Sequence, residues 1–166
     1  MRGKMETMSE IETWISQLQK SESADARADA AEELGEFGGE PAIAALTAAL
    51  GDPADEVKVS AILALGELRV SDAASQIEAF LSGPDPNGRG AAAVALGQIG
   101  SSRAASLLIP LADDSVAAVR GAAAWALGTL GDMAAYGVLV QLSQDDDPDA
   151  ADAAEEALRR IKRRRN

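Results

Sequence analysis

Basic and acidic side chains recur along the chain at matching intervals, and pairs of this kind can either bind an anion or join one structural unit to the next. Successive members of each set are 31 or 62 residues apart. The basic set is Arg27, Lys58, Arg89 and Arg120, and the acidic set is Asp52, Asp114 and Asp145. We call these residues the ladder. Their spacing alone is compatible with an anion-binding stripe and with a structural network of ion pairs.

The chain contains no His and no Cys. This composition excludes Ser-His-Asp triads, Cys-His dyads and zinc sites built on imidazole or thiolate groups. Asp145, Asp147, Asp149 and Glu156 match four positions of a calcium-binding loop, but Ala150 stands where that loop needs Gly. Acidic residues also favour a helix N-terminus for electrostatic reasons alone. We therefore expect no metal, no cofactor and no catalytic residue, and a protein that is not an enzyme.

The net charge of −12 argues against a nucleic acid or an anionic membrane as the partner. Six of the 15 basic residues nevertheless cluster near the C-terminus, namely Arg159, Arg160, Lys162, Arg163, Arg164 and Arg165. This cluster either ends a helix in solvent or contacts acidic groups, in a partner, in nucleic acid or lipid, or in the chain itself. The chain shows no signal-peptide pattern and no apolar run of membrane-spanning length, so we expect a cytoplasmic protein.

The elements that must position these residues follow from an internal repeat of 31 residues. Aromatic residues make up only 3% of a chain that is 47% hydrophobic, so the core must consist of aliphatic side chains and Ala, which favours helices. A Leu-Gly pair recurs once per repeat, and glycine after an apolar turn predicts the end of a helix. The pairs are Leu34-Gly35, Leu65-Gly66, Leu96-Gly97 and Leu127-Gly128.

Each repeat thus predicts two helices, which we call helix A, ending at Leu-Gly, and helix B, which follows it. Because one helical pair cannot bury its apolar face alone, neighbouring repeats must stack into a solenoid. We call the positions that recur every 31 residues columns. The apolar columns place a lone helix B at residues 9–20 and a lone helix A at about 149–164, which gives a half repeat, four full repeats and a half repeat. We expect a disordered tail over 1–8, one repeat domain of about ten helices over 9–162, and a basic tail over 163–166.

The pattern V-(R/K)-x-x-A-x-x-A-L-G-x-(I/L)-G, followed by A-x-x-x-L, resembles the HEAT-like repeat, including the repeats of bilin lyase subunits. Val57-Lys58 and Val119-Arg120 match its opening, and residues 96–100 match its middle. The resemblance implies a right-handed α-solenoid in which the ladder is structural, helix B lines the concave face and helix A the convex face. The family's iron-binding hydroxylases use His-Glu pairs, which a chain without His lacks.

Two surfaces depart from an ordinary solvated face. The outward positions of helix B carry no charge, which suits an apolar partner helix or merely permits tight curvature. This predicted concave groove includes Ala44, Ala45 and Ala48 and the candidate binding residues Ser75, Gln76, Ser106, Leu107, Met133, Tyr136, Val138 and Gln141. On helix A, the predicted convex stripe of Leu63, Val94 and Trp125 is apolar where the end repeats carry Glu, which indicates an exposed interface.

From these surfaces we predict a non-catalytic scaffold or adaptor that binds a protein partner or a second copy of itself. The alternative, which the resemblance implies, is a bilin-lyase-like subunit or a chaperone for a small ligand.

Overall fold

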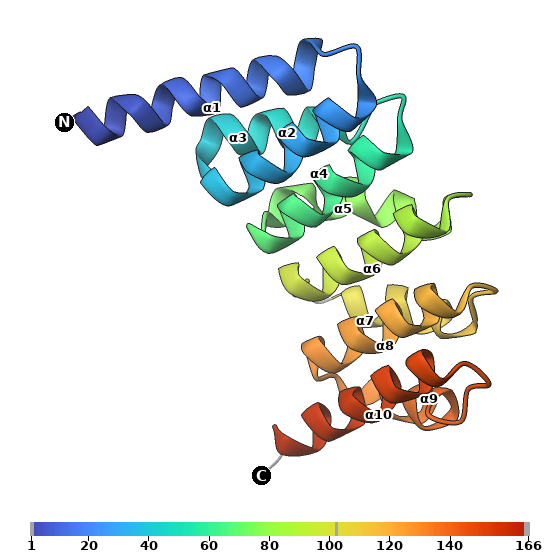
Figure 1. Ribbon diagram of the computed structural model, residues 1–166. Coiled ribbons are helices and arrows are strands. Elements are labelled where there is room, and N and C mark those ends of the chain that lie inside the picture. Colours follow the sequence, from blue (N-terminus) through green and yellow to red (C-terminus); the bar gives the residue numbers. More distant parts are fainter. Residues whose placement is uncertain (1, 102, 165–166) are drawn as a thin grey trace.

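The protein is an all-α solenoid, as predicted. The structure is a computed structural model that describes residues 2–101 and 103–164, with side chains from residue 8 onward (Figure 1). The described part contains ten α-helices, four short 3₁₀-helices and no strand. The helices are α1 (Arg2–Lys20), α2 (Ala24–Phe37), α3 (Gly39–Ala49), α4 (Asp55–Glu67), α5 (Ala74–Glu78), α6 (Pro86–Ile99), α7 (Ala104–Leu108), α8 (Ala117–Leu130), α9 (Tyr136–Leu142) and α10 (Pro148–Arg163).

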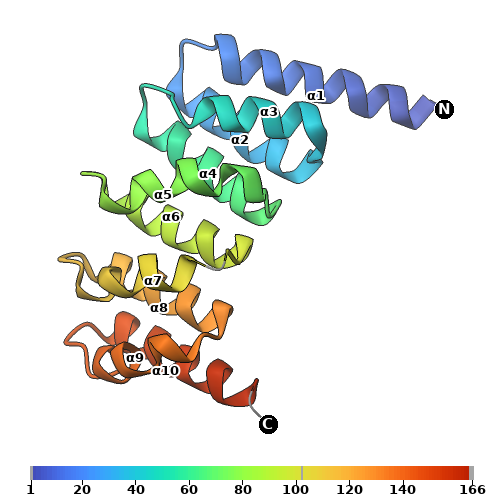
Figure 2. The same ribbon diagram turned by 180° about the vertical axis from the view of Figure 1, so that it is seen from behind.

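The helices form two layers that follow the repeat (Figures 1 and 2). The A helices α2, α4, α6, α8 and α10 stack in order, each in contact with the next, and the B helices lie behind them. Helix α1 is the lone B helix of the first half repeat, and α10 is the lone A helix of the last. Helix α1 begins at Arg2, so residues 2–8 are helical where we expected a disordered tail, and its N-terminal end projects beyond the stack.

The B helices after α3 are short α-helices combined with 3₁₀ turns. These turns are η1 (Ser71–Ala73), η2 (Ala79–Ser82), η3 (Ile109–Asp113) and η4 (Met133–Ala135). Pro110 lies within η3 and cannot donate a backbone hydrogen bond there, which favours leaving the α-helical pattern. One leucine per repeat in the A layer, namely Leu34, Leu65, Leu96 and Leu127, is completely buried. The core therefore lies between the layers, as the columns predicted.

The glycines of the Leu-Gly pairs do not end their helices. Helices α2, α4, α6 and α8 each continue for one or two residues beyond them, and three of these helices end at glycines with positive φ, Gly38, Gly100 and Gly131. A Cβ atom added at Gly35, Gly66, Gly97 or Gly128 would lie 2.6–2.8 Å from an alanine of the next A helix. These glycines therefore allow neighbouring A helices to approach closely, and our expectation that they mark the helix ends is wrong.

Candidate binding groove and interrupted ladder

Three rungs of the ladder are ion pairs that join one repeat to the next. Arg89 donates from Nε and Nη2 to the two carboxylate oxygens of Asp114, at 2.7 and 2.9 Å. The pairs Arg27–Asp52 and Arg120–Asp145 have the same two-bond geometry, with distances of 2.6–2.8 Å. Each arginine lies 25 residues before its aspartate, so every pair bridges two consecutive repeats.

Each of these aspartates also holds the start of the following helix. Asp114 Oδ1 accepts a hydrogen bond from the Val116 amide at 2.9 Å, and Asp52 and Asp145 accept equivalent bonds from the amides two residues later. The hydrogen bonds from arginine hold the pKa of all three carboxyl groups below the usual aspartate range. Side-chain exposure is only 14% for Arg89 and 11% for Asp114. Nε, Nη1 and Nη2 of each of these arginines donate to groups of the chain itself, so the three rungs are filled by internal links.

The ladder is interrupted at Lys58. A partner 25 residues later would stand at position 83, which is Gly83. Lys58 instead pairs with Asp55 within its own helix, at 2.5 Å. Lys58 therefore does not form the inter-repeat link that its place in the ladder predicted.

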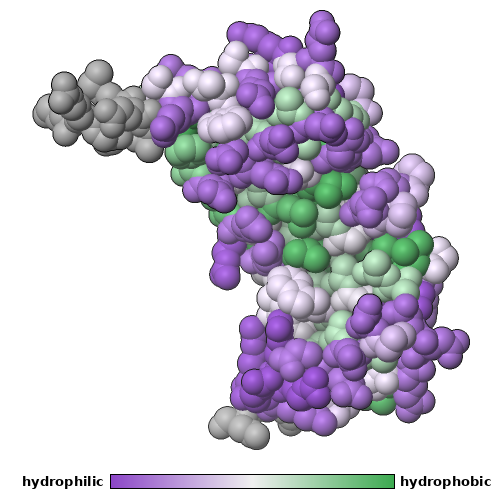
Figure 3. All heavy atoms as spheres, in the orientation of Figure 1, coloured by the Kyte–Doolittle hydropathy of each residue, from purple (hydrophilic) through white to green (hydrophobic). Residues whose placement is uncertain are grey.

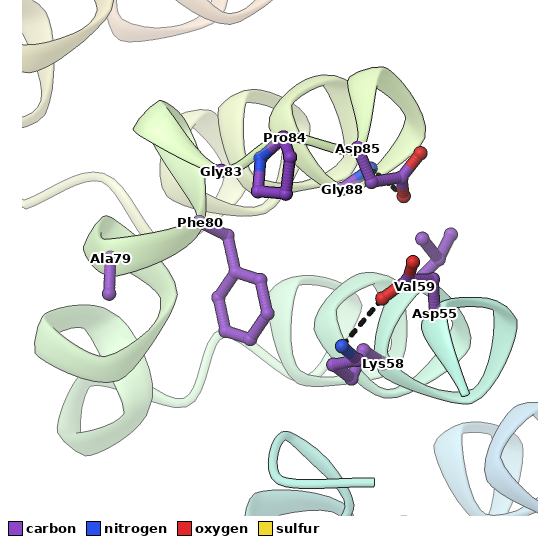
Figure 4. A pocket seen from close by; sticks show the side chains of 9 residues that line it. All are labelled: Asp55, Lys58, Val59, Ala79, Phe80, Gly83, Pro84, Asp85 and Gly88. Carbon is purple, nitrogen blue, oxygen red and sulfur yellow. Dashed lines mark hydrogen bonds and ion pairs between the residues drawn. The ribbon is translucent and has the colours of Figure 1, made fainter. Parts of the chain in front are cut away.

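A pocket of about 250 Å³ occupies the interrupted rung. Helix α4 contributes Asp55, Lys58 and Val59, the η2 turn contributes Ala79 and Phe80, and the following segment contributes Gly83, Pro84, Asp85 and Gly88. Figure 4 shows the Phe80 ring between Lys58 and the Gly83–Pro84 backbone. The wall opposite the charged residues is therefore aromatic and aliphatic.

A larger groove lies over the A helices. It has a volume of about 640 Å³ and crosses α2, α4, α6 and α8. Its apolar lining includes Val59, Leu63, Ala91, Val94, Val116 and Val119, and its acidic rim consists of Glu32, Asp55, Glu56 and Asp85. Hydrophobic residues gather in the middle of this face between hydrophilic flanks (Figure 3). The groove and the pocket share Asp55, Val59 and Asp85 as lining residues, so the two adjoin each other.

The predicted convex stripe is only partly reproduced. Leu63, Val94 and Trp125 are all half-buried, whereas we expected exposed side chains. Leu63 and Val94 line the groove, and the groove reaches α8 without including Trp125. The groove hollows this face locally across α2, α4, α6 and α8.

The predicted surface of helix B is mostly exposed and uncharged. Ser75, Gln76, Ser106, Met133 and Gln141 are exposed, and Leu107, Tyr136 and Val138 are half-buried. Ala45 is buried against the core, contrary to our prediction. The prediction missed Val140, which is 39% exposed in α9, the last B helix. The apolar Ile109, one repeat earlier in the same column, could have indicated it.

Part of the C-terminal basic cluster contacts the chain itself. Glu156 pairs with Arg159, Arg160 and Arg163, and these bonds hold the pKa of Glu156 below its usual range. Arg164 Nη1 donates to the Leu130 carbonyl at 2.7 Å, which satisfies the C-terminal end of α8. Arg165 lies outside the described residues.

The acidic residues that matched a calcium loop have other partners. Asp145 holds Arg120, and Asp147 accepts hydrogen bonds from the amides of Asp149 and Ala150 at the start of α10. Among the described residues, no helix is long and apolar enough to cross a membrane.

The two-helix repeats of this chain stack in order, which makes it an α-solenoid, and three Arg–Asp ion pairs join consecutive repeats. The profile of the HEAT repeat family matches residues 11–82 and 74–159, so this chain belongs to the HEAT repeat family. No protein of curated function matches the chain significantly in sequence.

The fold is similar to a chain in the structure of the complex of CpcE and CpcF of phycocyanin lyase from Nostoc sp. PCC7120. The TM-score is 0.80 and the sequence identity is 28%, over 92% of this chain and 65% of that one. This chain thus spans less than two thirds of its neighbour's length.

An engineered protein and a designed protein are similar in fold alone. An engineered protein has a TM-score of 0.68 at 22% identity, over 91% of this chain and 80% of that one. A designed armadillo repeat protein in complex with the peptide (KR)4 has a TM-score of 0.66 at 19% identity, over 89% and 80%.

Proposed function

We propose that this chain is a bilin-lyase-like subunit that acts by binding. The groove over its A helices holds a small ligand of the bilin type, which has a largely apolar body, and a protein partner completes the complex. The observation that carries the proposal is the continuous apolar groove in a HEAT-repeat fold that resembles a chain of the CpcE–CpcF complex. The volume of about 640 Å³ lies within the range of small-molecule sites.

The chemistry of the groove suits such a ligand. Linear tetrapyrroles have an extended, largely apolar body with several N–H donors along one edge. Val59, Leu63 and Val94 offer an apolar floor, and the rim carboxylates Glu32 and Glu56 can accept hydrogen bonds from N–H groups. With neither His nor Cys in the chain, we assign it a holding role and leave covalent chemistry to a partner.

The proposal is tested by titrating the purified protein with phycocyanobilin. We expect a shift in the visible absorption of the pigment and an induced circular dichroism signal. Val94→Glu places a charge on the apolar floor and should weaken binding at least about tenfold. Ser75→Glu, on the exposed surface of α5, is the matched control and should bind as the original protein does. An unchanged pigment spectrum with the original protein would refute a bilin-binding role.

A non-catalytic scaffold that binds only protein is the second candidate. The exposed Met133 and Val140 of the last B unit favour it, because two large apolar side chains exposed in one helical unit can belong to an interface. Light scattering coupled to size-exclusion chromatography measures whether this surface associates with a second copy.

A further inference from the structure

The position of the small pocket follows from the ladder itself. At each filled rung, two kinds of donor converge on one carboxylate: an arginine from the preceding A helix and the backbone amide two residues after the aspartate. At the interrupted rung, the corresponding donors are the Lys58 ammonium and the Asp85 amide. Gly83 supplies no carboxylate to either of them.

We propose that the interrupted rung is a subsite for the carboxylate of a small ligand with an apolar body, which takes the place of the missing aspartate. The Lys58 side chain is 24% exposed, so its charge is partly shielded from water and accessible from the pocket. The ligand's carboxylate binds Lys58 and the Asp85 amide, and its apolar part packs on Phe80 and Val59.

The two carboxylates that line the pocket, Asp55 and Asp85, do not prevent an anion from binding there. Asp55, the present partner of Lys58, is 63% exposed and can turn into water when the ligand's carboxylate replaces it. Asp85 accepts hydrogen bonds from the amides of Asn87 and Gly88, at 3.1 and 2.8 Å. Its charge is thus balanced by the N-terminus of α6.

The subsite adds a contact for a carboxylate to the groove of the proposed function, and it rests on that function for the long apolar body of the ligand. Because the pocket adjoins the groove at Asp55, Val59 and Asp85, a ligand that spans both places its carboxylate at Lys58 and its body over Leu63 and Val94.

The test uses a probe that is not a bilin, so the subsite and the proposed function can fail separately. The full chain is titrated with 3-phenylpropionate and with its neutral amide, 3-phenylpropionamide, and binding is followed by NMR. We expect 3-phenylpropionate to bind with a dissociation constant on the order of 1 mM and to shift signals of Lys58, Phe80 and the Asp85 amide. The neutral amide should bind at least about tenfold more weakly.

Two variants separate this subsite from a general effect on folding. Lys58→Gln should abolish the preference for the carboxylate. The double variant Lys58→Arg, Gly83→Asp rebuilds the missing rung from the chain's own side chains, so it should stay folded yet lose binding. Gly83 has φ −67° and ψ 160°, close to the φ −61° and ψ 144° of Asp114. An added Cβ would lie 3.3 Å from the Phe80 carbonyl oxygen, a tight contact that a small shift relieves.

The outcomes test the carboxylate subsite and the proposed bilin-binding function separately. Equal binding of acid and amide, or undiminished binding by the rebuilt-rung variant, overturns the subsite. If 3-phenylpropionate binds at Lys58 while phycocyanobilin does not bind, the subsite stands and the proposed function falls.

Discussion

A matched pair of glycines in α8 tests how closely the A helices approach each other. A Cβ added at Gly128 would lie 2.6 Å from both Cα and Cβ of Ala157 in α10. A Cβ added at Gly121, seven residues earlier in the same helix, would have its nearest neighbour, Ala150 Cα, at 3.7 Å, which is an ordinary contact. Gly128→Ala and Gly121→Ala therefore make the same chemical change in two different packing environments.

The expected free energies follow from two opposing effects. Replacing a helical glycine by alanine stabilises the helix by about 1 kcal/mol in either position. At position 128 the methyl group must also push α8 and α10 apart by roughly 1 Å to reach a normal carbon–carbon separation. Overpacking of this kind costs about 1–3 kcal/mol. Gly121→Ala should therefore stabilise the protein by about 1 kcal/mol, and Gly128→Ala should leave it between unchanged and about 2 kcal/mol less stable.

The assay is thermal and urea unfolding followed by helical circular dichroism. For a chain of this size, each kcal/mol corresponds to about 2–4 °C in Tm, so a difference of about 1–3 kcal/mol between the variants is measurable. Gly90→Ala and Gly97→Ala in α6 repeat the comparison, since their added Cβ atoms would lie 3.9 and 2.8 Å from α8. Equal stabilisation by both members of each pair would refute the close approach of the A helices.

Three further predictions concern the ladder, the core and the B-helix surface. The Arg89 guanidinium lowers the pKa of Asp114 in the folded protein, so below about pH 5 the unfolded chain binds more protons than the folded one. The contribution of this pair to the free energy of unfolding is therefore complete above that pH and falls as the pH drops toward the lowered pKa. Urea midpoints of Asp114→Asn should fall less steeply with acid, and an unchanged slope would contradict this. Leu96→Ala, at a completely buried site, should cost about 3–5 kcal/mol in chemical unfolding, and Leu158→Ala, at the half-buried site of the same column, clearly less. If Met133 and Val140 form a self-association surface, Val140→Asp should lower the mass measured by light scattering, and an equal mass for both proteins rejects that surface.

Most of the fold could be predicted from the repeat period, because apolar side chains at fixed columns are buried only when neighbouring repeats stack. The number of helices and the two layers were predictable for this reason. Three of the ladder's ion pairs were predictable because their basic and acidic residues recur with the same period. The Leu-Gly pairs were misassigned because a glycine at a helix end and a glycine at a close helix contact both need the absence of a Cβ atom. The apolar Ile99 and Leu130, which continue the helical pattern beyond these glycines, could have separated the two cases.

The shape of the A-helix face could not be predicted from the columns. Whether Leu63 and Val94 stand on a ridge or in a groove depends on how closely successive helices approach and at what angle they cross. The tight glycine–alanine contacts draw the A helices together, which is a property of pairs of residues in different repeats. The hydrophobic pattern within one helix does not contain this information.

The interrupted rung was visible in the sequence, because the offset of 25 residues that joins Arg27 to Asp52 leads from Lys58 to Gly83. In a repeat protein the shared columns maintain the scaffold, so a departure from them either weakens the stack or serves another purpose. Here the departure of Lys58 and Gly83 opens a pocket, and the departures at Leu63 and Val94 make the adjoining groove apolar. The two features share the same side of α4, and this convergence of independent departures on one surface is the strongest reason to seek the function there.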